Sequence, residues 1–387
     1  MTHPTPPPLP TPPSRSLFAA LTSRPWLLAA VAFVAGALVT SLMWGIGALA
    51  AGPAPTVAAP TSAPGRTASV QPTPTSTGSM PSAQLPSSQA ASAECPTPTV
   101  SVASADALST ALAQAQPGDV ISLAPGTYVG KFVATASGTA DDPITLCGPQ
   151  DAVLDGDGVK GGYVFHLDGA QHWHLLGFTV TNGQKGVMAD GTTGTTIEGL
   201  TVFHIGDEAI HLRKHSTDNR VVGNDISETG LRRDKFGEGV YIGTADSNWC
   251  NITDCKPDES NGNIIEGNYI HGTSSEAVDI KEGTRDGILR GNTFDGSSIV
   301  GADSWVDVKG NNWLIEGNTG TNSPLDGFQT HEIGNEGYGS NNTFRGNKAT
   351  VNGPGFGFSF TPVNDNVVTC DNVVESAAEG YANVDCS

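Results

Sequence analysis

The sequence predicts an all-β fold in which short strands stack into a parallel β-helix, a solenoid. Two short segments recur between residues 163 and 360, and both have the composition of strands bounded by Gly and Asn turns. The chain also contains 48 glycines and only one stretch with a helical period, which disfavours helical repeats. Repeats of this size cannot bury an apolar face alone, so they are expected to stack on one another.

The first recurring segment has Gly-Asn at a fixed position, mostly after a pair of apolar residues. Both residues tolerate a positive φ, so the dipeptide predicts a turn between two short strands. Stacked turns would place the asparagine amides one above another as a hydrogen-bonded ladder. The segment occurs as "RVVGNDI" (220–226), "IIEGNYI" (264–270), "ILRGNTF" (288–294), "LIEGNTG" (314–320) and "TFRGNKA" (343–349), with Asn224, Asn268, Asn292, Asn318 and Asn347 in the same slot.

The second recurring segment is six residues long, with apolar residues mostly at its third and fifth positions. With the period of a strand, these side chains face the core, and those at the fourth and sixth positions face outward. Eight copies start 22 to 38 residues apart: "YVFHLD" (163), "KGVMAD" (185), "EAIHLR" (208), "EGVYIG" (238), "EAVDIK" (276), "SWVDVK" (304), "DGFQTH" (326) and "GFGFSF" (355).

Residues 25–50 form an uncharged apolar run, "PWLLAAVAFVAGALVTSLMWGIGALA", long enough to cross the ~30 Å hydrocarbon core of a bilayer. It is expected to be a transmembrane anchor or an export signal. Its length favours an uncleaved anchor, whereas "ALAAG" at 48–52 offers a small-residue cleavage site. Arg15 and Arg24 place a short segment, residues 1–24, in the cytoplasm. The remainder is therefore expected outside the cell, membrane-anchored or secreted.

Residues 51–94 are almost entirely Ala, Pro, Ser, Thr and Gly, which predicts a disordered linker.

The β-helix domain then spans residues 95–387 and holds all six cysteines, an even number in a compartment where disulfides persist. A zinc site is disfavoured because no Cys-x-x-Cys occurs. A monomer is expected. Position along the chain predicts the pairs Cys95–Cys147, Cys250–Cys255 and Cys370–Cys386.

The stretch "SADALSTALAQAQPGD" (104–119) predicts a short amphipathic helix. Ser104 or Asp106 is a suitable N-cap, and Pro117-Gly118 should end the helix. This helix is expected to cover the open end of the solenoid.

The β-helix domain is strongly acidic. Residues 95–387 include 38 acidic and 16 basic residues, a net charge of −22. Nucleic acid is disfavoured as a partner because its recognition needs a basic surface. A polyanionic substrate would need local positive charge or a bridging cation.

The run "ALAQAQPGDVISLAPGTYVGKFVATASGTADDPITLCG" (111–148), together with the Gly-Asn coils, resembles the entry module of right-handed parallel β-helix proteins of the pectate-lyase-like group. Among these, it is most similar to the family of alginate lyases and chondroitinase B. The resemblance covers residues 95–387. It implies a right-handed coil and a lyase that acts on a uronic-acid polysaccharide.

The alignment of the second segment brings two Asp-x-Lys units together. If the strands starting at 276 and 304 are neighbours, Asp279 and Asp307 lie about 4.8 Å apart, with Lys281 and Lys309 beside them. Such charges either neutralise one another as a surface checkerboard or form a site. The two outward rows read His166, Met188, His211, Tyr241, Asp279, Asp307, Gln329 and Phe358, and Asp168, Asp190, Arg213, Gly243, Lys281, Lys309, His331 and Phe360.

The functional interpretation of these rows is β-elimination. Removal of the C5 proton of a uronate requires the charge of its carboxylate to be neutralised and a base to be held within reach. Calcium on acidic side chains would supply the first, and a Lys or Arg with a depressed pKa the second. The resemblance implies Glu276 and Asp279 as calcium ligands, with Asp307 beside them, and Lys281 as the base.

This chain has Asp307 and Lys309 where that family has an Arg-His pair, so Lys309 and Arg213 remain alternative bases. His331 flanks the patch and is a further catalytic candidate. The candidate substrate-binding residues are His211, Tyr241, Gln329 and Trp305, the last expected to face outward and stack on a sugar ring.

Three further features are open to two interpretations. Glu208, Glu238 and Glu276 begin three consecutive strand segments, either as metal ligands or as turn residues whose carboxylates accept backbone N–H bonds. The insertion "TADSNWCNITDCKPDESNG" (244–262) is the longest and is expected to wall one side of a cleft. "RRDK" (232–235) is either a solvated loop or a guide for an anionic chain.

Two other functions remain in competition with a lyase. Two carboxylates at strand spacing also suit a retaining glycoside hydrolase, but the adjacent lysines would lower the carboxyl pKa values and weaken a general acid. A surface β-helix that only binds polysaccharide, as an adhesin does, is the third class. A C5-epimerase is disfavoured because the sequence has no Asp-Pro-His-Glu stretch.

Overall fold

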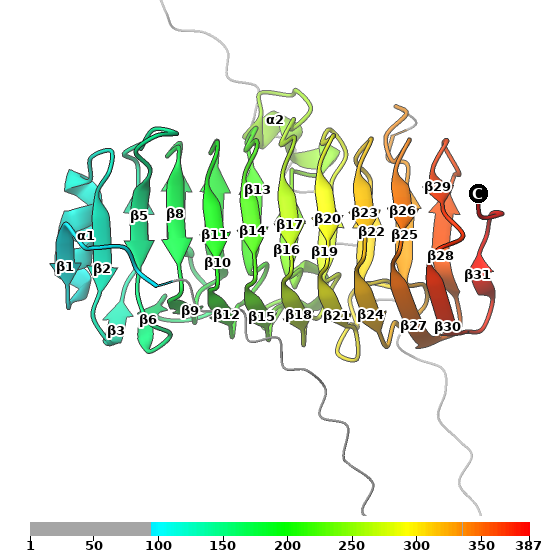
Figure 1. Cartoon of the computed structure of the whole chain (residues 1–387), viewed down its shortest axis with the longest axis horizontal. Helices are drawn as coiled ribbons and strands as arrows, with labels where there is room; N and C mark the ends of the chain where they lie inside the picture. The colour runs from blue at the N-terminus through cyan, green and yellow to red at the C-terminus, as the bar shows by residue number, and fades with distance from the viewer. Residues whose placement is uncertain (1–93, 335) are drawn as a thin grey trace, which may run out of the picture. The chain divides into compact units, whose positions relative to one another are not determined.

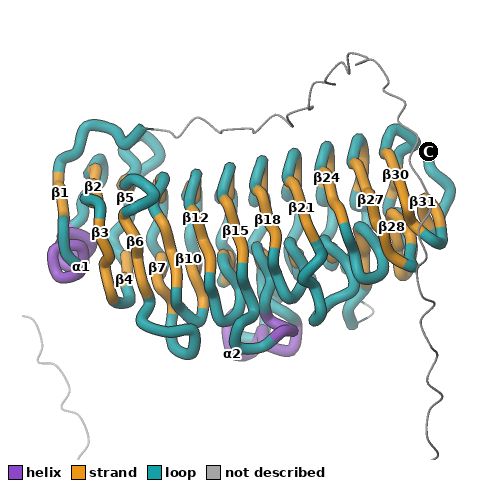
Figure 2. The backbone as a smooth tube through the Cα atoms, turned by 90° about the horizontal axis from the view of Figure 1, so that it is seen from below, coloured by secondary structure: helices purple, strands orange, loops and turns teal. Residues whose placement is uncertain are grey.

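A computed structural model describes residues 94–334 and 336–387, which form a parallel β-solenoid with three sheets along its length (Figures 1 and 2). Each coil contributes one strand to each sheet, and every strand pairs in parallel with the equivalent strands of the coils before and after it. The solenoid predicted from the repeats is therefore confirmed. The expected segments 1–24 and 25–50 and nearly all of the linker lie outside the described residues.

Sheet A has eleven strands. In spatial order they are β1 (Val100–Val102), β2 (Val120–Leu123), β5 (Ile144–Cys147), β8 (Trp173–Leu176), β11 (Thr196–Glu198), β14 (Arg220–Val222), β17 (Ile264–Glu266), β20 (Ile288–Arg290), β23 (Leu314–Glu316), β26 (Thr343–Arg345) and β29 (Val367–Val368).

Sheet B has ten strands. They are β3 (Gly126–Val129), β6 (Ala152–Asp155), β9 (Thr179–Thr181), β12 (Thr201–Phe203), β15 (Asp225–Ser227), β18 (Tyr269–His271), β21 (Thr293–Asp295), β24 (Thr319–Thr321), β27 (Lys348–Gly353) and β30 (Val373–Ala377).

Sheet C also has ten strands and carries the predicted outward rows. They are β4 (Phe132–Ala134), β7 (Tyr163–Asp168), β10 (Lys185–Asp190), β13 (Ile210–Arg213), β16 (Val240–Ile242), β19 (Val278–Ile280), β22 (Val306–Val308), β25 (Phe328–His331), β28 (Phe356–Thr361) and β31 (Gly380–Ala382).

The helices of the described residues are few and short. Helix α1 (Ala105–Gln114) lies at the N-terminal end of the solenoid (Figure 1), and its N-cap is Ser104, whose hydroxyl accepts a hydrogen bond from the backbone N–H of Ala107. Helix α2 (Trp249–Ile252) follows a 3₁₀ turn (Asp246–Asn248) in the long insertion, and a second 3₁₀ turn covers Asp234–Phe236. None of the helices in the described part of the chain has the length and hydropathy needed to cross a membrane.

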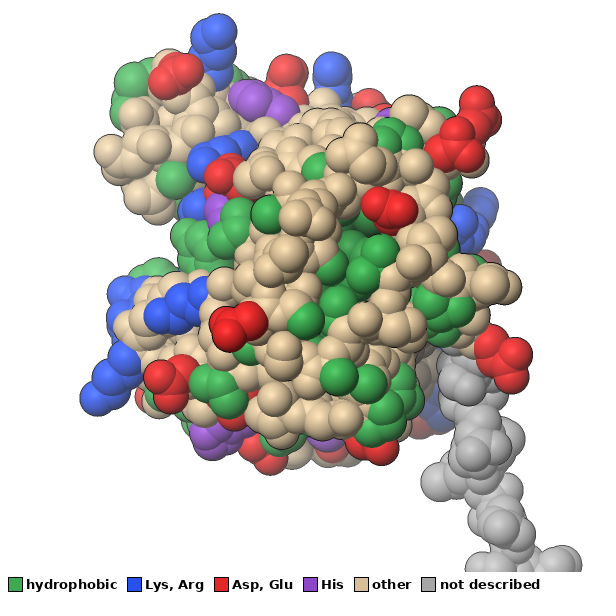
Figure 3. All heavy atoms as spheres, turned by 90° about the vertical axis from the view of Figure 1, so that its left-hand side faces the viewer, with side chains coloured by type: hydrophobic (Ala, Val, Ile, Leu, Met, Phe, Trp, Pro, Cys, Tyr) green, Lys and Arg blue, Asp and Glu red, His purple; other side chains and the backbone are tan. Residues whose placement is uncertain are grey.

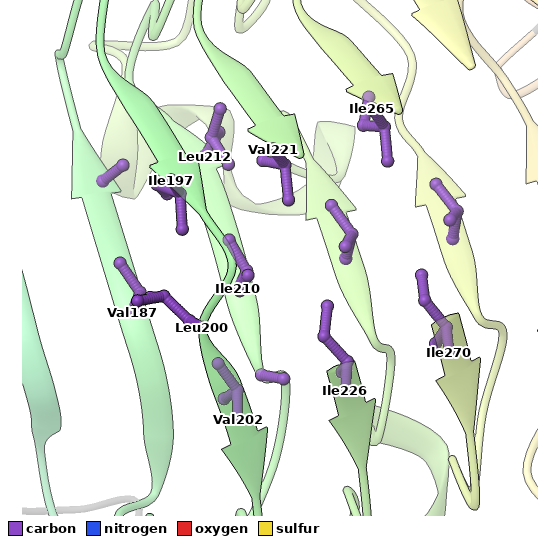
Figure 4. Close-up of a cluster of buried hydrophobic side chains, with 14 of the residues drawn as sticks. Val187, Ile197, Leu200, Val202, Ile210, Leu212, Val221, Ile226, Ile265 and Ile270 are labelled. Atoms are coloured by element: carbon purple, nitrogen blue, oxygen red, sulfur yellow. The ribbon is translucent and has the colours of Figure 1, made fainter. Parts of the chain in front are cut away.

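The core is a continuous apolar column between the three sheets. Figure 4 shows side chains from all three sheets pointing into it, among them Val187, Ile210, Ile197, Val221, Ile265, Val202, Ile226 and Ile270. Each coil alone has too little apolar surface to fold, so burial against its neighbours stabilises the stack.

The asparagine ladder is confirmed and is longer than predicted. Each amide Nδ2 donates to the Oδ1 of the next asparagine at 2.9–3.0 Å, from Asn224 through to Asn372. The preceding glycines, such as Gly223 and Gly291, have φ between 59° and 65°, a region that a residue with a Cβ rarely adopts. The Gly-Asn pair therefore sets the turn and supplies its hydrogen bonds.

The three predicted disulfides are all present: Cys95–Cys147, Cys250–Cys255 and Cys370–Cys386. The first joins the segment before β1 to β5, and the last joins the turn after β29 to the C-terminal segment. These two disulfides therefore fix the chain at the two ends of the solenoid.

The predicted orientation is wrong in the last aligned strand. Phe358 pairs with Phe328 and Phe360 with Thr330, and both phenylalanines are buried in the core. The outward residues of β28 are therefore Ser359 and Thr361. The alignment was one residue out of phase here because "GFGFSF" has an aromatic residue at every even position, and burial of the large side chains decides which face turns inward.

Candidate active site

The two Asp-x-Lys units lie side by side, as predicted. In sheet C, Asp279 of β19 is directly opposite Asp307 of β22, and the alternating residues Val278, Ile280 and Val306 point into the core. The same outward row continues through His211, Tyr241 and Gln329 on the neighbouring strands. We call the outward side chains of β13, β16, β19, β22 and β25 the site face.

Five ionisable side chains on the site face form an unbroken chain of ion pairs. Asp279 accepts from Lys281 Nζ at 2.6 Å and from Lys309 Nζ at 2.8 Å. Lys309 also contacts Asp307 at 2.6 Å, and Asp307 contacts His331 Nδ1 at 2.9 Å. Both carboxylates are nearly inaccessible to solvent, so their lysine partners neutralise charges that burial would otherwise make unfavourable.

This arrangement changes the expected basicity of the two lysines. Burial alone would lower the pKa of Lys281, but the Asp279 carboxylate more than offsets it and raises that pKa above its usual value. Lys309 responds in the same way to Asp279 and Asp307. Burial would raise the pKa of Asp307, but Lys309 and the imidazole of His331 lower it below its usual range. Both lysines are therefore ammonium ions at neutral pH and are poor bases as they stand.

Tyr241 lies in the middle of the site face, beside these charges. The ammonium of Lys281 lies 5.1 Å from the centroid of its ring, and the imidazole of His211 packs edge-on against the other side at 4.4 Å. Burial, together with the carboxylates of Asp279 and Glu238, raises the pKa of Tyr241 well above its usual value. Within the described residues, its hydroxyl has no protein hydrogen-bond partner, and the side chain is partly exposed.

His211 is held in a buried, neutral form. Its Nε2 donates to the carbonyl oxygen of Gly243 at 2.9 Å, and its Nδ1 lies 3.3 Å from Lys185 Nζ. Burial and the positive charges of Lys185 and Arg213 lower its pKa well below the usual value. Because both ring nitrogens are engaged and the residue is inaccessible, His211 supports Tyr241 and does not itself face a ligand.

Three glutamates form a third row at the beginning of the same strands. Glu208, Glu238 and Glu276 precede β13, β16 and β19 at equivalent register, and Lys185 Nζ contacts Glu208 at 2.7 Å. Glu238 is 4% exposed, and its Oε2 has no hydrogen-bond partner in residues 94–334 and 336–387. Burial and the neighbouring Glu208, Asp279 and Glu276 carboxylates raise the pKa of Glu238 well above its usual value. Burial and Asp279 likewise raise that of Glu276.

The carboxylates of Glu238, Glu276 and Asp279 approach within 4.8 Å of one another, which is the acidic cluster that a cation would use. Asp307 is not part of this cluster. The set fits calcium poorly, because both oxygens of Asp279 are already paired with ammonium groups that a divalent ion would have to displace. Protons on Glu238 and Glu276 offset the excess negative charge without such displacement.

Arg213 lies on the same face, two strands before Lys281, but is fixed in another network. Its guanidinium donates to Asp190 at 2.6 Å and to Tyr163 at 3.2 Å, and Lys214 and His166 also contact Asp190. Burial would raise the pKa of Asp190, but these partners lower it far below its usual value. Arg213 therefore remains charged and is unsuited to accept a proton.

Two predicted substrate contacts, Trp305 and Gln329, are buried and not presented to solvent. The outward orientation of Trp305 is wrong: the side chain is 0% exposed, its ring packs on Phe328, and its Nε1 donates to the carbonyl of Thr321. The ring occupies space left by glycine, since a Cβ on Gly320 would lie 2.4 Å from it. Gln329 is on the predicted strand face but is buried and donates to Asp326 at 2.9 Å.

Sheet C lies on the side of the solenoid that is hollowed (Figures 2 and 3). Figure 3, an end-on view of the solenoid, shows one side of the molecule hollowed between two projecting lobes, with Lys or Arg, His and acidic side chains inside. The segments that flank β16 on either side, residues 228–239 and 243–263, are the two extended connections in this region. Long connections therefore lie at both ends of strand β16.

The insertion that carries α2 projects from the solenoid (Figures 1 and 2) and is fixed across several coils. Its buried Asp258 accepts from the backbone N–H groups of Lys214 and His215, after β13. Its Trp249 ring meets Tyr338, three coils after β16, at 6.0 Å. The insertion thus lies beside the C-terminal ends of the site-face strands, where the sequence predicts one wall of a cleft.

Comparison with known proteins agrees with this geometry. A family model described as "Pel9A-like, right handed beta helix region" matches residues 90–238. An alginate lyase from Paenibacillus sp. str. FPU-7 is 35% identical, with a TM-score of 0.68 over 74% of this chain and 99% of that one. No curated protein matches the sequence.

Two more distant structures share only the coil. Pectate lyase Pel9A is 16% identical, with a TM-score of 0.49 over 72% of each chain. The catalytic domain of a GH87 alpha-1,3-glucanase is 13% identical, with a TM-score of 0.43 over 76% of this chain and 67% of that one. Neither likeness is strong enough to bear on the site. On the strength of the Paenibacillus enzyme, the chain belongs to the family of right-handed parallel β-helix proteins that includes this alginate lyase.

Proposed function

We propose that the protein is a polysaccharide lyase that cleaves a uronic-acid polymer, with alginate as the first substrate to test, by β-elimination on the site face. The observation that carries this proposal is the pairing of Tyr241 with Lys281: the Lys281 ammonium lies over the phenol ring, 5.1 Å from its centroid, and the Tyr241 hydroxyl has no hydrogen-bond partner among the described residues. A relative that is 35% identical over nearly its whole length is an alginate lyase, which supports the choice of substrate.

In the proposed reaction Tyr241 transfers the proton. Its phenolate takes the proton from C5 of the uronate, the C4–O bond breaks as the C4=C5 double bond forms, and the phenol returns the proton to the leaving glycosidic oxygen. A C5–H is a weak acid, so a base of high pKa suits this step even though its ionised form is scarce. Tyr241 is the candidate because the lysines of the site face are held as ammonium ions.

Lys281 supplies positive charge in this mechanism. Its ammonium lies where it can meet the substrate carboxylate, and it stabilises the negative charge that develops on that carboxylate when C5 loses its proton. Asp279 orients it at 2.6 Å, and Lys309 keeps Asp279 from carrying an unbalanced charge. The second Asp-x-Lys unit is therefore proposed as support for the first.

No calcium is needed in this proposal, since the ammonium of Lys281 takes the part that a cation would play. The extracytoplasmic location also remains a proposal; three disulfides in the β-helix domain support it, because such bonds persist in oxidising compartments.

A glycoside hydrolase is the second candidate, and one observation favours it. Glu238 and Glu276 have raised pKa values, as a general acid would. Against it, Asp279 and Asp307, the two carboxylates at strand spacing, have their oxygens held in ion pairs and cannot serve as an acid and a nucleophile without losing them.

The absorbance of unsaturated uronate separates these functions. The full chain is incubated with alginate, pectate and a glycosaminoglycan, and ultraviolet absorbance and reducing ends are followed together. A lyase gives a rise in both, a hydrolase gives reducing ends alone, and a binding protein gives neither. Tyr241→Phe is expected to lower kcat by about 10²- to 10⁴-fold without changing the fold. A Tyr241→Phe variant that is as active as the parent would refute the assignment.

A further inference from the structure

A second feature borders the site face: the loop before β16, residues 229–237, which we call the rim loop. It presents two large apolar side chains to solvent, Leu231 and Phe236, of which Phe236 is 42% exposed. The guanidinium of Arg233 lies over the Phe236 ring, 3.8 Å from its centroid. Isolated exposed apolar residues are ordinary, but an exposed ring stacked with an arginine is a common means of binding a ligand.

The rim loop is firmly held in place. Asp207, which is fully buried, accepts from both Arg232 and Arg233 and from Gln184. The backbone N–H of Arg232 donates to Gly206 at 2.8 Å. A loop this constrained loses little further entropy when a ligand binds, so its exposed side chains are preorganised.

The loops that follow in the next two coils brace the rim loop from the other side. Ser274 donates from its hydroxyl to the carbonyl of Asp234 at 2.8 Å and accepts at its own carbonyl from Gly301. A Cβ on Gly301 would lie 2.2 Å from the same Asp234 carbonyl, so the two loops are in direct contact. The neighbouring Val300 is 73% exposed and extends the apolar surface.

The rim loop is continuous with the candidate active site. Asp207 precedes Glu208 and Gly237 precedes Glu238, so the loop's anchors are adjacent to two glutamates of the site face's third row. Arg233 donates one protein hydrogen bond, from Nη2 to Asp207, and its side chain is 46% exposed. Its remaining N–H groups have no acceptor in the part of the chain that the structure describes, and Lys235 beside it is exposed. The net charge of the whole chain is −20.

We infer that the rim loop is a binding subsite for the uronate polymer, outside the reacting centre, in which Arg233 holds a carboxylate and Phe236 packs on the apolar face of a sugar ring. The inference rests on the proposed function for its ligand. A planar guanidinium forms paired hydrogen bonds with a carboxylate, and an aromatic face suits the C–H groups of a sugar. The rim loop thus supplies the local positive charge that an acidic protein needs to hold a polyanion.

The test measures binding apart from turnover. Alginate affinity is determined by titration calorimetry for the full chain carrying Tyr241→Phe, alone and with Arg233→Ala, Arg233→Lys or Phe236→Ala. Arg233→Ala is expected to weaken binding roughly tenfold, Arg233→Lys by less, and Phe236→Ala several-fold. The matched control is Arg345→Ala, an equally exposed arginine paired with Glu316 on sheet A, which should leave the affinity unchanged.

The salt dependence of the affinity identifies the kind of contact that each variant removes. The loss of alginate affinity in Arg233→Ala should become smaller as the salt concentration is raised, because this substitution removes a contact between charges. The loss of affinity in Phe236→Ala should not depend on salt in this way. Equal affinity in all the rim variants would overturn the subsite while leaving the lyase assignment intact. A parent chain that cleaves none of alginate, pectate and a glycosaminoglycan, and binds none of them, would instead overturn the proposed function.

Discussion

At the scale of single residues, the site is defined by what each ionisable group is paired with. The family resemblance implies Lys281 as the base, with Lys309 as an alternative, but pairing with Asp279 and Asp307 holds both lysines as ammonium ions. Tyr241 sits between them and His211 with its hydroxyl unbonded to protein within the described residues. The proposed chemistry therefore depends on Tyr241, a proton-transfer group that no ion pair among the described residues holds.

The role of Lys281 can be separated from that of a base. Lys281→Arg retains the positive charge but cannot accept a proton, whereas Lys281→Ala loses both. We expect kcat/KM to fall at least about tenfold further in the alanine variant than in the arginine variant, since charge stabilisation in the transition state is what is lost. If the two variants are equally inactive, measured on alginate at one pH, Lys281 is the base and Tyr241 is not.

The pH dependence of kcat/KM follows from the raised pKa of Tyr241. Because the phenolate is the reactive form and its pKa lies above the usual value, the phenolate fraction grows as the pH rises. The rate should climb by about tenfold per pH unit from neutral into the alkaline range. Removal of the adjacent ammonium in Lys281→Ala should move this limb to still higher pH. A rate that falls steadily above neutrality would contradict a tyrosine base.

At the scale of elements, turn chemistry explains why the coil was predictable. Gly-Asn recurs with a positive φ at the glycine and a buried amide ladder at the asparagine. This dipeptide alone therefore predicts both the turn and its hydrogen bonds. The register of Asp279 against Asp307 follows from that repeat. Strand parity alone was a weaker guide: it placed Trp305 outward, yet this residue precedes β22, where the alternation has not begun.

The tertiary pairings of the site could not be read from the repeat. Glu238 and Glu276 occupy one slot in two copies, but nothing in a linear pattern says that a third carboxylate, Asp279, reaches within 4.8 Å of both. Nor does it say that the cations go to Asp279 rather than to the glutamates. Which carboxylate each lysine pairs with depends on how the side chains pack in three dimensions, and the sequence pattern does not encode that packing.

The asparagine ladder should contribute measurably to stability. Asn292 donates to Ile265 and Asn318 and accepts from Asn268, all in the interior. Asn292→Ala would leave these groups buried without partners, so we expect a loss of about 2–4 kcal/mol in the free energy of unfolding, measured with guanidinium chloride. The exposed neighbour Thr293→Ala is the control and should change it by less than about 0.5 kcal/mol. Comparable losses in both variants would argue against the ladder.

At the scale of the whole molecule, this acidic solenoid places several cations on or beside the face where we propose that a polyanion binds. The chain has a net charge of −20, yet Lys281 and Lys309 follow the neighbouring strands β19 and β22, and the exposed Arg233 lies in the rim loop before β16. Parallel stacking makes this possible, since each coil adds one residue to the same row at strand spacing. The long connections on either side of β16 leave the register of these rows intact.

Treatment with a chelator tests whether Lys281 or a bound cation supplies the positive charge on the site face. If the ammonium of Lys281 provides the positive charge, treatment with a chelator should leave kcat/KM on alginate within about twofold of the untreated protein, because the acidic cluster has no cation to lose. The control is the same treatment followed by added calcium. Loss of activity on chelation and its return with calcium would show that Glu238, Glu276 and Asp279 hold a metal.

The most direct measurement is a structure of the Tyr241→Phe chain with an alginate oligosaccharide bound. The account predicts that the sugar lies in the hollow over β16 and β19, with a uronate carboxylate within hydrogen-bonding distance of Lys281 Nζ and C5 of that sugar facing residue 241. An oligosaccharide bound on sheet A or sheet B, or one whose carboxylates avoid Lys281, would contradict it.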